Sequence, residues 1–349
     1  MIVTVTPNPS LDRTLQLDRL VRGAVNRASG GRVDAGGKGV NVSRALAGHG
    51  VKTTAVAPMG GLDGARLAEL LAGSGIEVRP VPVAGGVRTN ITVAEPDGTT
   101  TKLNEPGPHL SPAEVEALRR AVLDAATPGC WVVCCGSLPG GVDATFFAEL
   151  LAPLHARGSR VAVDTSGAAL RAVLSPGRDA GGGGGRDGGP GLLPDLIKPN
   201  HEELAEAVGH PLSTLGDVVA AAQELRARGV GTVLASLGVD GAVLVDGAGA
   251  THAEARVEHP RSTVGAGDAL LAGFLSRYAE PAGPVPAAGS AVLDAQIVAR
   301  EALVAALAWG AAATCLPGSR MPGPDDVAAV AVTLHDRCDL QRTLGGTPQ

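Results

Sequence analysis

Short β-type runs alternate with helical patterns along most of the chain, and this alternation limits the possible folds more than any other feature. Strands that alternate with helices build a parallel sheet with helices packed on both faces. The predicted strands are apolar or β-branched runs at residues 2–6, 53–57, 131–135, 160–164, 196–198 and 232–236. The predicted helices lie at residues 39–48, 64–72, 112–125, 144–156, 202–208, 218–227 and 266–278. The sequence therefore predicts an α/β fold with a central, mostly parallel sheet.

Two β-rich stretches interrupt the alternation, at about residues 12–34 and 88–104. In the second stretch, residues 89–93 and 99–103 flank a turn at 96–98, which is the pattern of a hairpin. We expect the two stretches to form a small sheet that stands off the main domain as a lid.

The rest of the chain divides into one large domain and two appendages. We predict a main domain over residues 1–322 and a C-terminal helix and tail over residues 323–349. Residues 177–191 are nearly all glycine and cannot form a core, so they are predicted to be a flexible surface insertion. A phosphate-binding loop is disfavoured there, because the ordered G-x-x-x-x-G-K-[ST] spacing and a following helix are missing.

Composition excludes several classes of function. The 349 residues carry a formal net charge of −6 and only 2% aromatic residues, so neither a basic nucleic-acid surface nor stacking on bases is expected. The run at residues 302–315 is too short to span a bilayer and is predicted to be a buried helix. The amino terminus is typical of a strand and not of a signal peptide, and the five cysteines match neither a disulfide framework nor a zinc site. We therefore expect a soluble, cytoplasmic protein with neither a membrane nor a nucleic-acid partner.

The strongest functional signal is the segment 262–268, Ser-Thr-Val-Gly-Ala-Gly-Asp, which leads directly into a predicted helix. Glycines at a helix start let backbone N–H groups converge on an anion, and the helix dipole adds to the attraction. Asp268 lies in the first turn, where its carboxylate can accept a proton from an attacking hydroxyl. A tight turn with Asp268 as a helix cap explains the segment equally well when it is taken alone.

A second glycine-rich turn, at residues 35–41 (Ala-Gly-Gly-Lys-Gly-Val-Asn), also opens a predicted helix. Here the backbone can approach a ligand closely, while Lys38 and Asn41 supply a cation and an amide in the first turn. These groups suit a sugar that carries hydroxyls and a phosphate. The ordinary alternative for Lys38 is a solvated surface lysine.

Together and in this order, the two turns resemble the signatures of the ribokinase-like, or PfkB-type, carbohydrate kinases. The resemblance extends from Thr4 to about Pro317, apart from the insertion at 177–191. It implies a ribokinase-like Rossmann-type sandwich with a small β-sheet lid, and transfer of the γ-phosphate of ATP to a sugar hydroxyl with the help of Mg²⁺. The lid often forms the dimer contact in this family, so a homodimer through the lid is a further expectation.

The resemblance also implies roles for particular residues. By this similarity Asp268 is the catalytic base, and Asn200 and Glu203 form an N-x-x-E element that organises magnesium, in part through water. The implied anion hole consists of Gly265, Ala266 and Gly267. The implied substrate-binding residues are Asp12, Gly37, Lys38, Asn41, Arg88, Asn90 and Ser137. The implied nucleotide-binding residues are Lys198, Ser236, Gly238, Gly241, Thr263, Gly265 and Gly267.

Further matches narrow the resemblance to the phosphofructokinase and tagatose 6-phosphate kinase subgroup. In this subgroup the carboxylate at Asp12 binds sugar hydroxyls, which suits a group that accepts hydrogen bonds from adjacent donors. The cations Lys38 and Arg88, with Ser137, would meet a phosphate that the substrate already carries. The matching segments are residues 6–12, 88–90, 104–107 and 136–139.

Several of these residues have ordinary structural alternatives. Arg88 suits a surface ion pair, Ser137 a helix N-cap and Asp12 a turn. Asn200 with Glu203 three residues later matches a capping box, and a capping box is compatible with metal binding.

The resemblance implies phosphorylation of a sugar phosphate, with fructose 1-phosphate preferred to tagatose 6-phosphate and fructose 6-phosphate. Unphosphorylated sugars are less favoured, because Lys38 and Arg88 would then meet no phosphate. A non-catalytic regulator that binds sugar phosphates is the alternative from a different class. The complete anion hole with Asp268 argues against that alternative, since a binding protein needs no base.

Overall fold

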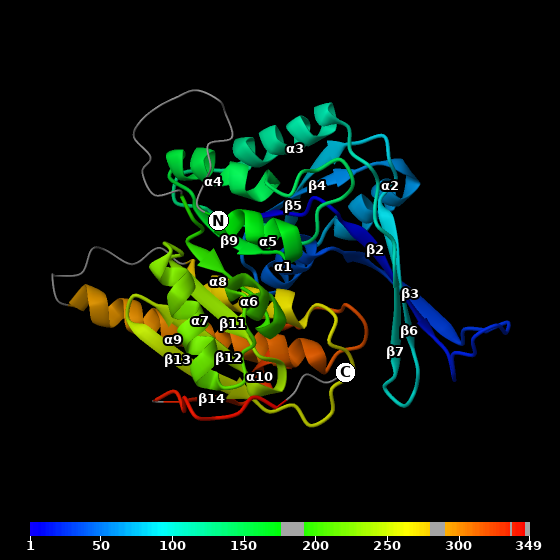
Figure 1. Cartoon of the computed structure of the whole chain (residues 1–349). Helices are drawn as coiled ribbons and strands as arrows, with labels where there is room; N and C mark the ends of the chain where they lie inside the picture. Colours follow the sequence, from blue (N-terminus) through cyan, green and yellow to red (C-terminus); the bar gives the residue numbers. More distant parts are fainter. Residues whose placement is uncertain (176–191, 280–289, 336, 346–349) are drawn as a thin grey trace.

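The computed structural model of the chain describes residues 1–175, 192–279, 290–335 and 337–345. A ten-stranded sheet forms its centre, and a separate four-stranded sheet extends from one side of the body (Figure 1). The predicted glycine-rich insertion at residues 177–191 lies outside the described residues.

The central sheet is mostly parallel, as the alternation of strands and helices predicts. Its strands are β1 (Ile2–Val5), β4 (Thr53–Met59), β5 (Ile76–Pro82), β8 (Trp131–Cys135), β9 (Arg160–Asp164), β10 (Leu196–Ile197), β11 (Thr232–Ser236), β12 (Ala242–Asp246), β13 (Gly249–Ala255) and β14 (Val332–Leu334). They follow the order β14-β13-β12-β11-β10-β9-β8-β1-β4-β5. All neighbours from β11 to β5 are parallel, and β12, β13 and β14 continue the sheet in antiparallel pairing.

Helices cover both faces of this sheet. One face is covered by α3 (Pro112–Ala125), α4 (Phe146–Ala156), α5 (Gly167–Leu174), α6 (His201–Val208) and α7 (Leu215–Ala227). The other face is covered by α1 (Lys38–Gly48), α8 (Ala266–Tyr278) and α9 (Ser290–Thr314). Strand β8 shows why both faces need a cover, because successive side chains of a strand point to opposite sides. Its Val132 and Cys134 lie in the first core, whereas Trp131, Val133 and Cys135 lie in the second.

The small sheet is built from four strands in the order β3-β2-β6-β7. These strands are β2 (Ser10–Gln16), β3 (Gly30–Gly36), β6 (Arg88–Ala94) and β7 (Thr100–Asn104). Both β-rich stretches of the sequence contribute, since β2 pairs with β6 in parallel and with β3 in antiparallel orientation. Its base packs on the body through Leu11, Ala35 and Val87, which join a cluster with α1 and with Leu67 and Leu71 of α2 (Gly61–Leu71).

Helix α9 is long and apolar enough to cross a membrane, and no other helix among the described residues has this property. The stretch concerned is Gln296–Thr314, of which 56% is buried inside the protein. It packs against α8 and lies over β13 and β14. The predicted buried helix at residues 302–315 is therefore the second half of a longer core helix.

The C-terminal region contains more regular structure than the predicted helix and tail. Helix α10 (Pro324–Ala328) packs against α9, and β14 then pairs with β13 at the edge of the central sheet. The sequence prediction also missed β5, which forms one edge of the sheet, and β12 and β13, which connect β11 to the other edge strand, β14.

The order of the central strands reverses between β1 and β8. From β1 the chain moves to β4 and β5 on one side, and from β8 it builds the sheet on the other side. Ligands of open α/β sheets bind beside such a reversal, at the carboxyl ends of the strands. At these ends lie Gly136 after β8, Asp164 at the end of β9 and Lys198 after β10.

Candidate active site

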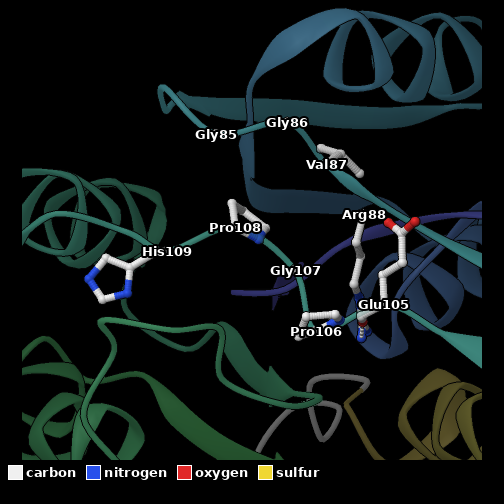
Figure 2. Close-up of a pocket in the computed structure, with 9 residues that line it drawn as sticks. All are labelled: Gly85, Gly86, Val87, Arg88, Glu105, Pro106, Gly107, Pro108 and His109. Atoms are coloured by element: carbon white, nitrogen blue, oxygen red, sulfur yellow. Dashed lines mark hydrogen bonds between the residues drawn. The ribbon is translucent and has the colours of Figure 1, made fainter.

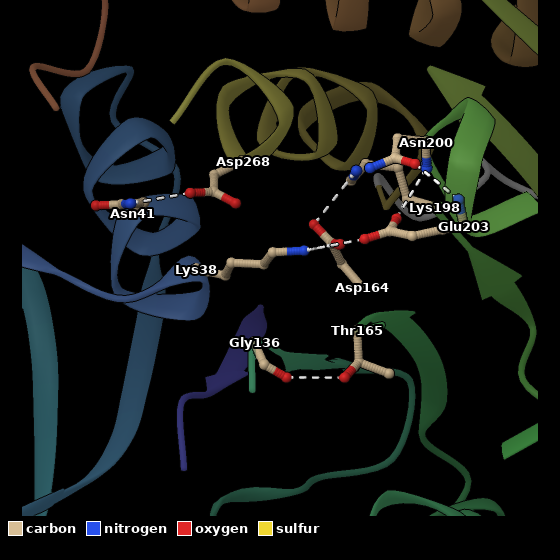
Figure 3. A network of polar contacts seen from close by, with 9 residues as sticks. All are labelled: Lys38, Asn41, Gly136, Asp164, Thr165, Lys198, Asn200, Glu203 and Asp268. Atoms are coloured by element: carbon tan, nitrogen blue, oxygen red, sulfur yellow. Dashed lines mark hydrogen bonds and ion pairs between the residues drawn. The ribbon is translucent and has the colours of Figure 1, made fainter. Parts of the chain in front are cut away.

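Two glycine-led helix starts meet at the carboxyl edge of the central sheet. Gly37 precedes α1 with φ 105° and Gly265 precedes α8 with φ 78°, a left-handed backbone that favours glycine. A Cβ at Gly265 would also lie 2.6 Å from Cε of Met321. The two first turns are joined because Asn41 Nδ2 donates a hydrogen bond of 2.9 Å to Asp268 Oδ2 (Figure 3). The two turns that the sequence singled out, 227 residues apart, therefore lie side by side.

Asp268 is buried at the start of α8, with 6% of its surface exposed. Burial and the nearby carboxylate of Asp164 raise its pKa to about 6, while Lys38, Asn41 and Lys198 oppose this shift. The first N–H groups of a helix have no partner within the helix, so the first turn formed by Ala266, Gly267 and Asp268 offers donors to an anion. The arrangement places a carboxylate that can accept a proton beside backbone groups that can bind a phosphoryl group.

Asp164 holds two lysines that come from different parts of the chain (Figure 3). Its Oδ1 accepts a hydrogen bond of 2.8 Å from Lys38 Nζ, and its Oδ2 lies 3.4 Å from Lys198 Nζ. Burial alone would raise the pKa of Asp164, but Lys198 and Lys38 lower it below the usual value. Burial would likewise lower the pKa of Lys38, but Asp164 and Glu203 raise it above the usual value. Lys38 therefore carries its positive charge into the site.

Asn200 and Glu203 form a capping box at the start of α6. Asn200 Oδ1 accepts from the backbone N–H of Glu203 at 2.8 Å, and Glu203 Oε2 accepts from the backbone N–H of Asn200 at 2.9 Å. The other carboxylate oxygen, Glu203 Oε1, lies 3.9 Å from Lys38 Nζ and faces the site. The structural alternative for this motif is therefore correct, and one oxygen stays available for a ligand.

The oxygens near this point fit a hydrated divalent cation. Glu203 Oε1 is not used by the cap, and the buried Asp164 Oδ2 accepts no hydrogen bond from any described residue, although Lys198 lies near it. Within the described part of the chain, no group of three or more His, Cys, Asp or Glu side chains could enclose a metal. Magnesium needs few protein oxygens because it keeps several of its water molecules. Two carboxylates near the start of α8 match that preference.

One of the predicted nucleotide-binding residues, Ser236, lies directly beside Asn200. Ser236 at the end of β11 forms a bridge with Asn200, and its N–H donates to the carbonyl of Pro199 at 3.0 Å. The loop that follows, η1 (Gly238–Asp240), is closed by Gly241, whose carbonyl accepts from Leu237 N–H at 2.8 Å. Thr263 lies on the segment that leads into α8 and accepts from Ala266 N–H at 3.4 Å. Ser236, Gly238 and Gly241 therefore lie at and just after the carboxyl end of β11, and Thr263 lies just before α8.

Asp12 lies at the base of the small sheet. Its Oδ1 accepts hydrogen bonds from Ser10 Oγ at 2.7 Å and from Asn90 Nδ2 at 3.0 Å. The carboxylate also lies against Gly36, where a Cβ would approach it to 2.4 Å. Residue 36 therefore has to be small, and Asp12 is fixed next to the turn that leads to Lys38.

Arg88 and Ser137 both contact Asn8, which the sequence prediction did not include. Arg88 Nη2 donates to the carbonyl of Asn8 at 3.2 Å, and Asn8 Nδ2 donates to Ser137 Oγ at 3.2 Å. A second donor, Arg88 Nη1, reaches the carbonyl of Glu105 at 3.0 Å. Lys38 is not part of this group, since its ammonium is held by Asp164 and Glu203.

Several buried polar atoms at the base of the small sheet have no hydrogen-bond partner among the residues that the structure describes. Buried polar groups are usually hydrogen-bonded, so such atoms indicate where a ligand or water binds. Arg88 Nε can donate, whereas the oxygens can accept from hydroxyls. The atoms are Asn8 Oδ1, Arg88 Nε and Asn90 Oδ1. This donor and acceptor set matches a ligand that carries both hydroxyls and negative charge.

A cavity of about 350 Å³ adjoins this group (Figure 2). It is lined by Arg88 from β6 and by two connecting segments, residues 85–87 and 105–109. The motif at residues 104–107 predicted part of this wall, but Gly85, Gly86 and His109 gave no signal in the sequence.

Comparison with known proteins identifies the class of this protein. The pfkB family of carbohydrate kinases matches residues 6–179 and 191–311, and the chain belongs to this family. The expectation drawn from the two glycine-rich turns is therefore confirmed. The protein is a sugar kinase, a phosphotransferase with an alcohol group as acceptor.

Individual related proteins have more specific names than the family as a whole. A 1-phosphofructokinase of Rhodobacter capsulatus is 37% identical over 341 residues, which are 95% of this chain and 96% of the relative. The ATP-dependent 6-phosphofructokinase isozyme 2 of Escherichia coli is 31% identical over 94% of this chain and 97% of its own length. A crystal structure of phosphofructokinase-2 from Escherichia coli in complex with substrates and products superposes with a TM-score of 0.79 at 30% identity. The superposition covers 94% of this chain and 97% of that structure, so the ribokinase-like fold class is confirmed as well.

Proposed function

We propose that this protein transfers the γ-phosphate of ATP to a sugar phosphate, with fructose 1-phosphate as the preferred acceptor and fructose 1,6-bisphosphate as the product. The observation that carries the proposal is the hydrogen bond between Asn41 and Asp268, which brings a sugar-side helix start and an anion-binding helix start together. The relative from Rhodobacter capsulatus named 1-phosphofructokinase supports the choice of sugar.

The acceptor sugar would lie at the base of the small sheet. Asp12 and Asn90 accept hydrogen bonds from its hydroxyls, while Arg88 and Ser137 bind the phosphate that it already carries. Gly37 lets the backbone approach the sugar closely, and Asn41 contacts it from the first turn of α1. Arg88 is suited to a phosphate, because a guanidinium presents several donors in a fixed plane.

The chemical step would be an in-line displacement at the start of α8. Asp268 orients the acceptor hydroxyl and takes its proton as the new O–P bond forms and the bond to the leaving ADP oxygen breaks. The N–H groups of Gly265, Ala266, Gly267 and Asp268 bind the transferring phosphoryl oxygens, where negative charge accumulates. Lys38 and Lys198 supply positive charge nearby, and Asp164 keeps both lysines in place.

The nucleotide and its metal would occupy the carboxyl ends of β10 and β11. Ser236, Gly238, Gly241 and Thr263 line the path of the ATP phosphates. We propose that Glu203 and Asn200 organise Mg²⁺, largely through water, with Asp164 Oδ2 as the next oxygen. The metal would neutralise charge on the phosphates while the protein residues hold the reacting groups in line.

A coupled assay tests the substrate. The purified protein is given ATP with fructose 1-phosphate, fructose 6-phosphate, tagatose 6-phosphate or free fructose, and ADP release is measured. We expect the highest kcat/KM with fructose 1-phosphate. A higher kcat/KM with either 6-phosphate would replace that choice by the second candidate, a tagatose 6-phosphate kinase or 6-phosphofructokinase. The relative named 6-phosphofructokinase isozyme 2, at 31% identity, supports this second candidate.

A third outcome would point to a different class of function. If the protein bound these sugar phosphates but transferred no phosphate to any of them, it would be a sugar-phosphate-binding regulator. The buried carboxylate beside an anion-binding helix start argues for catalysis, because burying an ionisable group costs stability and such perturbed groups cluster at functional sites.

We also propose a cytoplasmic homodimer joined through the small sheet, which would then act as a lid over the sugar. Apolar side chains are exposed on this sheet and its loop, among them Val25 and Leu103 at 78% and 58%. A related enzyme, phosphofructokinase-2 from Escherichia coli, has been solved in a tetrameric inhibited form. The apolar helix α9 lies in the core, which agrees with a soluble protein.

A further inference from the structure

Arg44, one turn after Asn41 on α1, gathers three separate segments. Its Nη1 donates to the carbonyl of Ala35 at 2.8 Å, to the carbonyl of Ser319 at 3.1 Å and to Asn41 Oδ1 at 3.2 Å. Its Nη2 lies 3.7 Å from Asp34 Oδ1. Only 18% of the side chain is exposed, so the guanidinium is mostly buried and links these segments inside the protein.

The contact with Asn41 decides how the amide of Asn41 is oriented. A side-chain amide has an oxygen that accepts and a nitrogen that donates, and exchanging the two ends reverses every hydrogen bond that it makes. Arg44 can only donate, so it attracts the oxygen of Asn41. The nitrogen is then directed to Asp268 Oδ2, to which it donates at 2.9 Å. A reversed amide would set an oxygen against the carboxylate and repel it.

Fixing one oxygen of the carboxylate leaves the other for chemistry. Asp268 Oδ2 is held by Asn41, and no other hydrogen bond to the Asp268 carboxylate is present among the described residues. In the proposed function, Oδ1 is then the atom that takes the proton from the acceptor hydroxyl. The Asn41 bond also favours the ionised carboxylate, because a donor stabilises negative charge.

We propose that Arg44 is a positioning residue for the general base, which acts by locking the Asn41 amide with its nitrogen toward Asp268. The inference rests on the proposed function, since it requires Asp268 to be the base. Two acceptors of Arg44 come from other segments: Ala35 lies near the end of β3 in the small sheet, and Ser319 lies two residues before Met321, which packs over Gly265. Arg44 thus fixes the base relative to both the sugar side and the anion-binding turn.

The test compares pH profiles of kcat/KM for fructose 1-phosphate, or for whichever sugar phosphate the assay above favours. Besides Asn41, the groups near Asp268 are Lys38 from α1, Asp164 from β9, Lys198 just after β10 and the thiol of Cys135 from β8, and none of them is altered. Arg44→Met keeps an apolar stem but removes the donors. We expect its kcat/KM at pH 8 to fall about tenfold. The acid limb, which is the pH range in which kcat/KM falls as the base is protonated, should move up by about one pH unit. KM for ATP should change less than about twofold.

Two further variants separate positioning from a general loss of structure. Asn41→Ala should move the acid limb in the same direction, and adding Arg44→Met to it should cause no further movement, because the amide is gone. Asp34→Asn removes the ion pair on the other side of Arg44 and should leave the limb in place. A structural role for Arg44 would lower the melting temperature and the active fraction without moving the limb.

Each result decides the proposal. An Arg44→Met limb that coincides with the wild-type limb overturns it, and so does a full additional shift in the Asn41→Ala background. If Arg44→Met does not fold, Arg44→Lys takes its place. Lysine lacks the planar guanidinium whose two terminal nitrogens contact Asn41 and Asp34 at once, so a smaller shift in the same direction is expected, and an unmoved limb overturns the proposal. Asp268→Asn with near-normal turnover would remove the base itself, which is a failure of the proposed function and is distinguished in this way.

Discussion

Asp268 is a buried carboxylate that lies close to a second one, Asp164, and both features keep its pKa near 6. Such a group is mostly ionised at neutral pH and still binds a proton readily, which is the compromise that a general base requires. The lysines on either side of Asp164 limit the shift, so the site keeps a carboxylate that is neither permanently protonated nor fully stabilised as an anion.

The first prediction at the residue scale concerns pH. The base acts in its deprotonated form, so kcat/KM for the sugar phosphate should rise with pH and level off above an acid limb near pH 6. Below that limb it should fall about tenfold for each pH unit. Initial rates between pH 5 and 8 at fixed ATP measure this, and a flat profile down to pH 5 would contradict the assignment of Asp268.

Replacing Asp268 by Asn should separate activity from stability. We expect kcat to fall by a factor of about 10² to 10⁴, since proton transfer is lost while the shape is kept. The folded protein holds the pKa of Asp268 above its usual value of 3.8, so ionisation costs stability as pH rises through about 6. The variant should therefore have a melting temperature several degrees above that of the wild type at pH 8. The corresponding gain in the free energy of unfolding is at most about 3 kcal/mol, and it should shrink toward pH 4. Thermal unfolding at both pH values checks this, and equal melting temperatures at pH 8 would count against a buried charge.

Arg88 offers a test of the sugar-phosphate side. Arg88→Ala should raise KM for the sugar phosphate at least tenfold and leave KM for ATP within about twofold, because its contacts lie at the base of the small sheet. Arg79, an exposed arginine on β5, provides the matched control, and Arg79→Ala should change neither constant. Equal increases in both Michaelis constants for Arg88→Ala would rule out a specific role.

Motifs in the sequence pointed to some residues of the candidate site, whereas others are brought to the site only by the fold. Asp268 and Asn41 could be found because each opens a helix after a glycine-rich turn. Asp164 had no clear role in the sequence, since its function depends on two lysines that the sheet brings to it from other segments. Arg44 gave no signal for the same reason: its partners Ala35 and Ser319 become neighbours only after folding.

At the scale of elements, the chain contains two comparable capping boxes that allow a controlled experiment. Asn200 with Glu203 caps α6 at the site, and Thr214 with Asp217 caps α7 away from it. Glu203→Gln and Asp217→Asn each keep a side chain that can accept the cap hydrogen bond and remove one charge, so their effects on stability should be similar and below about 1 kcal/mol.

Only the first of these two variants should affect the metal. We expect Glu203→Gln to need about tenfold more Mg²⁺ for half-maximal activity, and Asp217→Asn to match the wild type. Titrating Mg²⁺ at saturating ATP and sugar phosphate measures this difference. Identical Mg²⁺ requirements for the two variants would show that Asn200 and Glu203 cap the helix and do not organise the metal.

The accuracy of the element prediction follows burial. Strands β8, β9 and β11 and helices α3 and α8 have the predicted bounds, because each buries a continuous or periodic apolar pattern. The prediction missed β5 and β14, which lie at the two edges of the sheet, and the antiparallel strands β12 and β13. An edge strand pairs on one side only and is often half exposed, so its pattern is weak, as in β5 with its alternating exposed residues. Burial does not explain the miss of β12, which is paired on both sides and mostly buried.

At the scale of the whole molecule, the small sheet should decide the oligomeric state. We expect a homodimer in sedimentation velocity experiments, because exposed apolar residues such as Leu103 on β7 favour burial against a second copy. Leu103→Asp should shift the protein toward monomers, and Leu62→Asp, at a 90% exposed position on α2, serves as the control. A monomeric wild type, or a Leu103→Asp variant as dimeric as the control, would exclude this contact.

The residues proposed for phosphoryl transfer and those proposed for the sugar stand on different parts of the molecule. Asp268 and Asn41 belong to helices packed on the central sheet, while Asp12, Arg88 and Asn90 belong to β2 and β6 of the small sheet. Such a division lets sugar preference evolve by substitutions in two strands while the transfer chemistry stays intact. Exchanging β2 and β6 with those of a relative that prefers another sugar should therefore transfer the preference and preserve the rate of ATP use.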